Sequence, residues 1–307
     1  MLSKQRLVAI VGPTASGKSE LAVSIARRYK GEIISADSVQ VYKGLNIGSA
    51  KVNGEWQVTN PNNKKFIYKN IPHYCIDFVN PKKRFTVAEY KTCADSAIVH
   101  ITKRKKLPIL VGGTGFYIQA VVDGIILPEV LPNKNLRKEL AKKSLDELSA
   151  DLGRLDPVRA KMIDVKNSRR LIRAIEIVTA TKKSITPLKR KSRYNTLLIG
   201  IRPSDDVLRK NIERRARVQI ATGLLREVRE LRSQKIPRKR IQELGFEYRL
   251  ALQCVEGIIS DEKLTELLIT ANWQYAKRQM TWFKRDRRIH WVRSAEEAFV
   301  WMDNFLA

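Results

Sequence analysis

Residues 7–19 read Leu-Val-Ala-Ile-Val-Gly-Pro-Thr-Ala-Ser-Gly-Lys-Ser. The apolar start of this stretch predicts a buried strand, and residues 12–19 fit the pattern G-x-x-x-x-G-K-[ST] at each fixed position. An apolar face at helical spacing follows, formed by Leu21, Ala22, Ile25 and Ala26. Strand, glycine-rich loop and helix in this order predict a phosphate-binding loop within an α/β sheet.

Each part of this loop has a chemical role toward a phosphate group. The predicted loop consists of Gly12, Pro13, Thr14, Ala15, Ser16, Gly17, Lys18 and Ser19. Its glycines let successive backbone N–H groups point at one anion, and the start of the helix adds its unpaired N–H groups. Lys18 is expected to reach the outer phosphate, and the Ser19 hydroxyl to hold Mg²⁺. The motif therefore predicts a ligand with a pyrophosphate group without saying which one.

The charge of the chain predicts a partner of opposite sign. The 307 residues include 59 Lys and Arg against 31 Asp and Glu, a net charge of +28. Such an excess indicates a polyanion or an anionic membrane surface, or else a generally basic proteome. The length favours one large domain with a smaller insert.

Targeting and metal signals are missing from the sequence. No apolar run approaches the ~20 residues of a membrane span, and the short N-terminal apolar run leads into the phosphate loop rather than forming a signal peptide. Cys75, Cys93 and Cys254 are widely spaced and form no metal-site pattern with the histidines. We therefore expect a cytoplasmic protein with no structural zinc and no membrane contact.

Asp37 is the first candidate catalytic residue. It follows a second predicted buried strand, residues 32–36, and ligands of open α/β sheets bind at the carboxyl ends of strands. A carboxylate there suits a general base or a Mg²⁺ ligand, but Asp is also favoured as a helix N-cap. Asp77 lies in another strand-like run, 73–78, and is either a site residue or a cap. The polar residues 53–72 between them predict a surface excursion or a flexible loop.

A third predicted strand, residues 107–111, ends in Gly112-Gly113-Thr114-Gly115. A conventional ATPase has a Mg²⁺-binding Asp at the end of such a strand, so its absence argues against nucleotide hydrolysis. The glycines suit close approach of a ligand backbone. Thr114 is either a ligand contact or an N-cap.

From Pro128 to Arg193 helical patterns dominate, interrupted at Pro132, Pro157 and Pro187. At helical spacing, three arginines lie off the apolar stripe of one predicted helix: Arg169, Arg170 and Arg173. This arrangement suits either contact with a phosphate backbone or a solvated helix face. We predict an α/β fold with a P-loop NTPase-like parallel sheet core, 1–127 and 194–307, and a mostly helical insert, 128–193.

The rest of the chain predicts a strand at 196–201 and helices at about 204–220, 223–233 and 240–256, with Gly245-Phe246 interrupting the last one. One of Arg214, Arg215 and Arg217 is expected to reach the phosphate site, where guanidinium suits pyrophosphate. Aromatic and basic residues alternate over 271–293, which fits base stacking or core packing. A last strand at 289–292 and a helix at 295–306 close the chain.

With these residues in view, the chain resembles the tRNA dimethylallyltransferase (tRNA isopentenyltransferase) family nearly end to end. The matching stretches are 12–19, Ile-Ser-Ala-Asp-Ser-Val-Gln-Val-Tyr (34–42), Ile-Gly-Ser-Ala-Lys (47–51), Pro-His-Tyr-Cys-Ile-Asp (72–77), Val-Gly-Gly-Thr-Gly-Phe-Tyr (111–117), Arg-Arg-Leu-Ile-Arg-Ala-Ile-Glu (169–176) and Ala-Lys-Arg-Gln-Met-Thr-Trp-Phe (276–283). The chain departs from the family pattern at Val52, where Pro is usual, at Phe246, where Tyr is common, and in the length of 53–72.

The resemblance implies transfer of a dimethylallyl group from dimethylallyl diphosphate to N6 of the adenine 3′-adjacent to the anticodon, with Mg²⁺ bound. It implies Asp37 as general base, Thr114 as a further catalytic-site residue, and Arg215 as a pyrophosphate ligand beside the loop. Residues implied to contact tRNA are Asp37, Ser38, Val39, Gln40, Thr114, Arg137, Arg169, Arg170, Arg173, Gly245, Phe246, Lys277, Arg278 and Gln279. The insert would grip the anticodon stem-loop, and a monomer without an obligate protein partner is the default expectation.

Two alternatives remain open at this stage. A P-loop kinase phosphorylating a small metabolite would also use Asp37 as base, but would leave the basic insert unexplained. A non-catalytic RNA-binding P-loop protein would use the basic surface alone.

Overall fold

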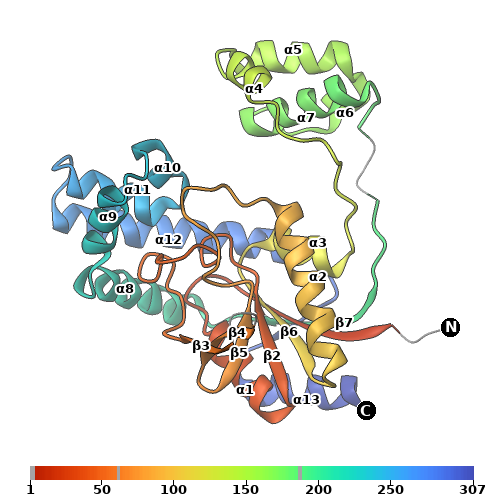
Figure 1. Ribbon diagram of the computed structural model, residues 1–307, viewed down its shortest axis with the longest axis vertical. Coiled ribbons are helices and arrows are strands. Elements are labelled where there is room, and N and C mark those ends of the chain that lie inside the picture. The colour runs from red at the N-terminus through yellow and green to blue at the C-terminus, as the bar shows by residue number, and fades with distance from the viewer. Residues whose placement is uncertain (1–3, 61–62, 186–188) are drawn as a thin grey trace. The chain divides into compact units, whose positions relative to one another are not determined.

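The computed structural model describes residues 4–60, 63–185 and 189–307 (Figure 1). The chain divides into two compact units, a core unit of Met1–Gly124 and Ser192–Ala307 and an insert unit of Ile125–Lys191. The core unit carries the sheet, and the insert unit is built from helices. The predicted fold class, an α/β parallel sheet core with a mostly helical insert, is confirmed.

The sheet has eight strands in the order β3-β4-β5-β2-β6-β1-β7-β8. The strands are β1 (Gln5–Val11), β2 (Gly31–Ser35), β3 (Glu55–Asn60), β4 (Asn63–Tyr68), β5 (Ile71–Tyr74), β6 (Leu107–Gly112), β7 (Tyr194–Ile201) and β8 (Ile289–Val292). From β5 to β8 the neighbouring strands are parallel, so their carboxyl ends lie at one edge. The predicted phosphate loop follows β1, at the centre of this edge.

Alternate side chains of β1 bury the two faces of the sheet. Leu7, Ala9 and Val11 belong to the apolar cluster with α2 (Val87–Lys103) and α3 (Gly115–Val122). Val8 and Ile10 belong to the opposite cluster, with α1 (Lys18–Arg28) and α13 (Ala295–Leu306). Because the sheet is covered on both faces, its central strands are continuously apolar rather than alternating.

The expectation of a loop at 53–72 is wrong for the described part of that stretch. β3 and β4 form an antiparallel hairpin that extends the sheet beyond β5. Its rings pack edge to face, with the Trp56 and Phe66 centroids 5.7 Å apart and Phe66 buried. The aromatic residues of the hairpin follow the two-residue period of a strand. The polar residues of the turn between them made the composition of the stretch resemble that of a loop. Pro61 and Asn62 lie outside the described residues.

A helical layer completes the core unit after β7. Its helices are α8 (Asp205–Ala221), α9 (Leu224–Ser233), α10 (Arg238–Glu243), α11 (Phe246–Val255) and α12 (Asp261–Phe283). The break predicted at Gly245-Phe246 separates α10 from α11, and the predicted last strand and helix are confirmed as β8 and α13. No helix among the described residues is long and apolar enough to cross a membrane.

The insert unit has its own small apolar core. Its helices are α4 (Lys134–Leu140), α5 (Leu145–Leu155), α6 (Pro157–Met162) and α7 (Ser168–Thr181). Leu148, Leu152 and Leu171 are buried in this core. Pro157 begins α6 at the first turn, where a missing N–H costs nothing, and Pro132 precedes the N-cap of α4. Pro187 lies outside the described residues.

Candidate active site

The phosphate loop has the backbone geometry needed to hold an anion. Gly17 caps α1 with φ 88°, and Ala15 also has a left-handed φ, 60°. The loop is fixed from outside by Gln279 on α12, whose side-chain Oε1 accepts from the Thr14 N–H at 2.7 Å and whose Nε2 donates to the Gly113 carbonyl at 2.9 Å. Gln279 therefore joins the loop after β1 to the turn after β6.

Two polar groups of the loop are candidates for contacts with a bound anion. The buried Ser16 Oγ has no hydrogen-bond partner among the described residues. Lys18 Nζ donates to the Pro13 carbonyl at 3.0 Å, back onto its own loop. Burial, reinforced by the Arg215 guanidinium and opposed by Asp37, lowers the pKa of Lys18 to about 8. A buried ammonium in this state gains most from a neighbouring anion.

Asp37 caps a turn with one carboxylate oxygen and leaves the other oxygen without a hydrogen bond in the described chain. Its Oδ1 accepts from the Val39 and Gln40 N–H groups at 2.8 and 3.2 Å, which orders the turn after β2. Its Oδ2 makes no hydrogen bond within the described part of the chain, and Asp37 lines a cavity. The two interpretations of Asp37, cap and reactive group, are therefore compatible, because each uses a different oxygen.

Thr114 occupies the N-cap position of α3 but does not cap it with its side chain. Instead its Oγ1 accepts from the Ser38 N–H at 3.0 Å, while the Thr114 N–H donates to the Ala36 carbonyl at 3.2 Å. Thr114 thus ties the turn after β6 to the turn that carries Asp37. It does not itself line the cavity, whereas Ser38 does.

One cavity of about 290 Å³ is lined by two of the three predicted catalytic residues, Asp37 and Arg215. Its polar lining includes Thr14, Lys18, Ser19, Asp37, Ser38, Gln40 and Arg215, and its apolar lining includes Val39 and Phe246. Of the three candidate arginines, Arg214, Arg215 and Arg217, only Arg215 lines this cavity; Arg214 bonds to Asn211 and Arg217 to Glu213, both at exposed positions. The buried Arg215 Nε has no partner among the described residues.

The break between α10 and α11 forms another wall of the cavity. Gly245 and Phe246 line it together with Tyr275 of α12, and the rings of Phe246 and Tyr275 lie 5.9 Å apart. Glu247, the next residue, is only 9% exposed and lines the same cavity. The resemblance implied a tRNA contact for the stretch 242–247 as a whole, but it did not single out this carboxyl group, two residues after Gly245.

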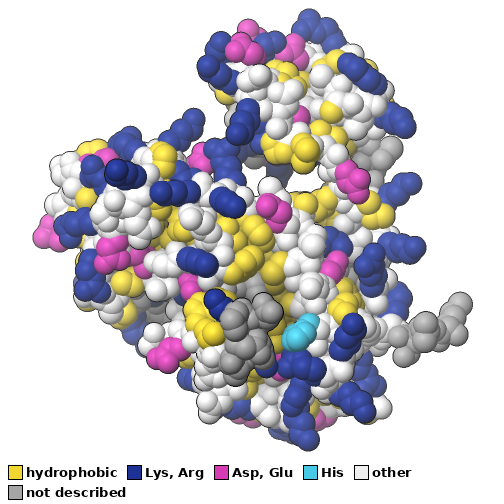
Figure 2. Space-filling model, in the orientation of Figure 1, with side chains coloured by type: hydrophobic (Ala, Val, Ile, Leu, Met, Phe, Trp, Pro, Cys, Tyr) yellow, Lys and Arg dark blue, Asp and Glu magenta, His cyan; other side chains and the backbone are white. Residues whose placement is uncertain are grey.

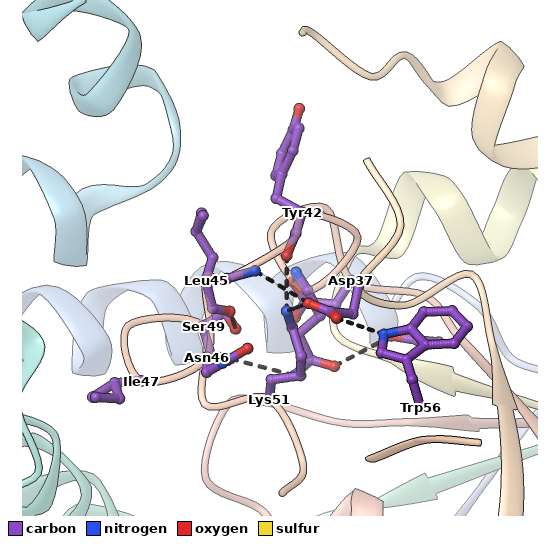
Figure 3. A network of polar contacts seen from close by, with 12 residues as sticks. Asp37, Tyr42, Leu45, Asn46, Ile47, Ser49, Lys51 and Trp56 are labelled. Atoms are coloured by element: carbon purple, nitrogen blue, oxygen red, sulfur yellow. Dashed lines mark hydrogen bonds and ion pairs between the residues drawn. The ribbon is translucent and has the colours of Figure 1, made fainter. Parts of the chain in front are cut away.

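A second cavity, of about 820 Å³, shares Ala50, Val52 and Arg215 with the first. Its wall contains a polar network (Figure 3) centred on the Lys51 ammonium, which bonds to the Tyr42 carbonyl at 2.7 Å and to Asp77 Oδ1 at 2.5 Å. Asp77 also accepts from Trp56 Nε1 at 2.8 Å. Asp77 therefore bonds both to the β3–β4 hairpin, through Trp56, and to the loop that precedes the hairpin, through Lys51.

That loop, residues 45–52, is held by a buried carboxylate that sequence reasoning also missed. Glu227 on α9 accepts from the Asn46 and Ile47 N–H groups at 2.7 and 2.8 Å through Oε2, and from Gly48 at 3.0 Å through Oε1. The Tyr248 hydroxyl donates to the same Oε1 at 2.7 Å. These four donors satisfy both oxygens of a side chain that has no hydrogen bond to a basic residue in the described chain.

The basic residues predicted on the insert unit fall into two kinds. Arg137 and Arg173 both bond to the buried carboxylate of Glu176, Arg137 through Nε at 2.8 Å and Nη2 at 2.6 Å. Arg169 and Arg170 are exposed, and Arg170 has only a surface ion pair with Asp164 at 3.3 Å. On the face drawn in Figure 2, Lys and Arg side chains are spread over each unit.

On α12 the rings pack and the cations are exposed. Phe283 is buried and Trp282 half-buried, whereas Lys277 and Arg278 are exposed beside the rings of Trp273 and Tyr275. Gln279, predicted with them, is buried and faces the phosphate loop. Core packing therefore accounts for most of the aromatic residues of this segment.

Known proteins match this chain over nearly its whole length. A family model described as IPP transferase matches residues 40–286, and one described as isopentenyl transferase matches residues 5–61. The tRNA dimethylallyltransferase of Anoxybacillus flavithermus is 39% identical over 298 residues, 95% of this chain and 92% of that protein. That of Halothermothrix orenii is 37% identical, over 93% of this chain and 86% of that protein.

Solved structures agree with these matches. The full-length tRNA isopentenylpyrophosphate transferase from Bacillus halodurans superposes with a TM-score of 0.69 at 33% identity, covering 99% of this chain and 96% of that one. A eukaryotic dimethylallyltransferase described as acting on tRNA has a TM-score of 0.80 and covers 98% of this chain and 79% of that one. At 22% identity, this second likeness supports the fold alone.

The sheet, the phosphate loop and the cavity at the carboxyl edge define a P-loop α/β enzyme of the transferase class. Within that class, the chain belongs to the IPP transferase family.

Proposed function

We propose that this protein transfers a dimethylallyl group from dimethylallyl diphosphate to N6 of the adenine 3′-adjacent to the anticodon of tRNA, releasing pyrophosphate. The observation that carries this proposal is the single cavity lined by the phosphate loop, Asp37 and Arg215. It provides a diphosphate site and a carboxylate within one enclosed space. The relatives named above carry the same activity in their names.

In the proposed reaction N6 attacks C1 of the dimethylallyl group, the C1–O bond breaks, and pyrophosphate leaves with the bonding electrons. Asp37 accepts the proton that N6 releases. Its unbonded Oδ2 supports this role, since Oδ1 already holds the turn in place. Thr114 supports the same geometry by bonding to Ser38, the next residue in the turn.

The diphosphate group is proposed to bind the N–H groups of the loop Gly12–Ser19, together with Lys18 and Arg215. Ser16 Oγ and Arg215 Nε, both buried without partners in the described chain, suit phosphate oxygens. Mg²⁺ would be held by Ser19 and by phosphate oxygens, and its positive charge would stabilise the departing pyrophosphate. One protein ligand, the Ser19 hydroxyl in the cavity lining, fits an ion that usually keeps few protein ligands.

The tRNA is proposed to bind across basic surfaces of both units, with the insert, 128–193, as the domain that grips the anticodon stem-loop. Proposed contacts in the core unit are Asp37, Ser38, Val39, Gln40, Thr114, Gly245, Phe246, Lys277, Arg278 and Gln279. Those in the insert are Arg137, Arg169, Arg170 and Arg173. The net charge of +28 supports a polyanionic substrate. The rings of Phe246 and Tyr275 offer a stacking surface for an unpaired base.

The test is transfer of label from radioactive dimethylallyl diphosphate to unmodified tRNA with Mg²⁺, run beside labelled ATP. Label in the tRNA from the prenyl donor alone supports the proposal. Phosphate transfer from ATP without prenyl transfer would overturn it in favour of a small-molecule kinase. A tRNA that already carries the modification is the matched control, since its N6 has no acceptor position left.

A further inference from the structure

Glu247 is a buried acid in the cavity that the proposed reaction does not use. It lies in the first turn of α11, directly after the Gly245-Phe246 break. It is 9% exposed, it lines the cavity, and its carboxyl group bonds to its own backbone N–H but to no other residue of the described chain. This single backbone bond leaves most of the hydrogen-bonding capacity of a buried carboxyl group unused, so a role in binding is the simplest reason for its position.

A second group with an unused hydrogen-bond donor, the guanidinium of Arg215, lines the same cavity. The guanidinium of Arg215 lies close enough to act electrostatically on Glu247, yet the two form no hydrogen bond or ion pair, and Arg215 Nε remains buried without an acceptor. An acid and a guanidinium that share a cavity without bonding leave room for a ligand that bonds to both. A phosphate oxygen accepts from Arg215 in any case, but accepts from Glu247 only if that carboxyl is protonated.

The surroundings of Glu247 favour the protonated form. Burial raises the pKa of Glu247 to about 7; Arg215 opposes this rise and Asp37 reinforces it. The titratable or charged side chains that share the cavity are Lys18, Asp37, His73, Arg215, Glu243 and Tyr275. Of these, Glu243 is already paired with Arg84, and burial lowers the pKa of His73. A bound diphosphate adds further negative charge beside Glu247 and so raises its pKa further.

We propose that Glu247 binds the diphosphate end of the prenyl donor as a neutral acid, donating its carboxyl O–H to a phosphate oxygen, so that donor binding takes up one proton. This role rests on the proposed diphosphate site and assigns it a ligand group that the phosphate-loop motif does not contain. Arg215 and Glu247 then bind the same group from two helices, α8 and α11.

The sign of the pH effect follows from the linkage between protons and ligand. Below the pKa of the free protein, about 7, Glu247 is already protonated and affinity is highest. As pH rises above 7, binding must first protonate the group, and affinity falls by about tenfold between pH 6 and pH 8. The fall ends only above the higher pKa of the complex.

The experiment is calorimetric titration of the full-length protein with inorganic pyrophosphate at fixed Mg²⁺, in buffers of different ionisation enthalpy. The dependence of the observed heat on buffer enthalpy gives the number of protons taken up. Glu247→Gln is the matched variant, because an amide keeps the shape and a donor of the neutral acid but cannot titrate. Protonation of pyrophosphate and of Lys18 contributes equally to both proteins and cancels in the difference.

We expect the wild type to take up close to one more proton at pH 8 than the variant does. The variant should bind within about threefold of the wild type at pH 6 and lose the Glu247 part of the pH dependence. Equal proton uptake by both proteins, or loss of binding by a folded variant at pH 6, overturns the role of Glu247. If the variant does not fold, the wild type decides: a binding curve that is flat from pH 6 to pH 8, after correction for free pyrophosphate, overturns it. No binding by the wild type at any pH overturns the diphosphate site itself.

Discussion

Replacing Glu227 with Gln tests whether a buried carboxylate holds the loop that separates the two cavities. The carboxylate accepts three backbone N–H groups, from Asn46, Ile47 and Gly48, and the Tyr248 hydroxyl. Gln keeps the shape but puts a donor where one acceptor was. Two carbonyl oxygens of the loop already accept from Gln219 Nε2, at 2.9 and 3.0 Å, so a new amide donor there would share an acceptor that is already in use.

The magnitude depends on which oxygen becomes the amide nitrogen. At the Oε2 position, two buried N–H groups lose their acceptor; at Oε1, only Gly48 does, because the Tyr248 hydroxyl can rotate to accept. The second arrangement costs about 1–3 kcal/mol for one orphaned donor, and about 1 kcal/mol more for each of the two bonds to Oε2 that become neutral. We therefore expect the free energy of unfolding to fall by about 3–5 kcal/mol.

Urea unfolding with an unchanged slope measures this loss. Glu230→Gln is the control, since it makes the same change on the same helix at an exposed ion pair with Arg226, 3.8 Å apart, where about 0.5 kcal/mol or less is at stake. Prenyl-donor binding should also weaken in Glu227→Gln, because Ala50 and Val52 of this loop line both cavities. A stability equal to that of Glu230→Gln would refute this account of the loop.

Three further outcomes follow from the site. Asp37→Asn should lower the transfer rate about 10²–10⁴-fold with tRNA binding kept, because Asn preserves the Oδ1 cap and removes only the base; near-normal single-turnover rates would contradict it. Arg215→Lys should raise the dissociation constant for pyrophosphate about tenfold or more through loss of the Nε donor, measured by calorimetry; unchanged affinity would show that Arg215 does not bind the diphosphate. Removing Arg169 and Arg170 together should reduce the log–log salt slope of tRNA binding by about 1–2 at unchanged stability, whereas Arg173→Ala should also destabilise the insert unit; an unchanged slope would leave Arg169 and Arg170 on a solvated face.

The local signals of the sequence were sufficient for the parts of the fold with a strong period. The strand before the phosphate loop, the strand at 289–292 and the helix at 295–306 were predicted because each combines an apolar pattern with a clear cap or turn. The hairpin at 55–68 was missed because its alternation is short and surrounds a polar turn. A two-residue period over so few positions is a weaker signal for a strand than the polar composition of the stretch is for a loop.

The groups that fix the site geometry could not be predicted, because their partners are far away in the sequence. Glu227 holds residues 46–48, and Gln279 holds Thr14. Neither residue type nor spacing reports such a pair. The choice among Arg214, Arg215 and Arg217 was likewise left open by the residues themselves, since it depends on how α8 is rotated against the loop.

The glycines at the end of β6 explain how this family member departs from P-loop ATPases. A side chain at Gly112 would collide with the backbone of Ala36, and one at Gly113 with the amide of Gln279. That amide bonds to Thr14 and to Gly113 itself. The position from which an ATPase carboxylate reaches Mg²⁺ is thus filled by a neutral group that holds the loop. The carboxyl groups of the cavity come instead from the turn after β2, from α10 and from α11, and the rings of Phe246 and Tyr275 line the same space. The proposed base, Asp37 in the turn after β2, suits displacement at carbon by an amine better than attack of water on a phosphate.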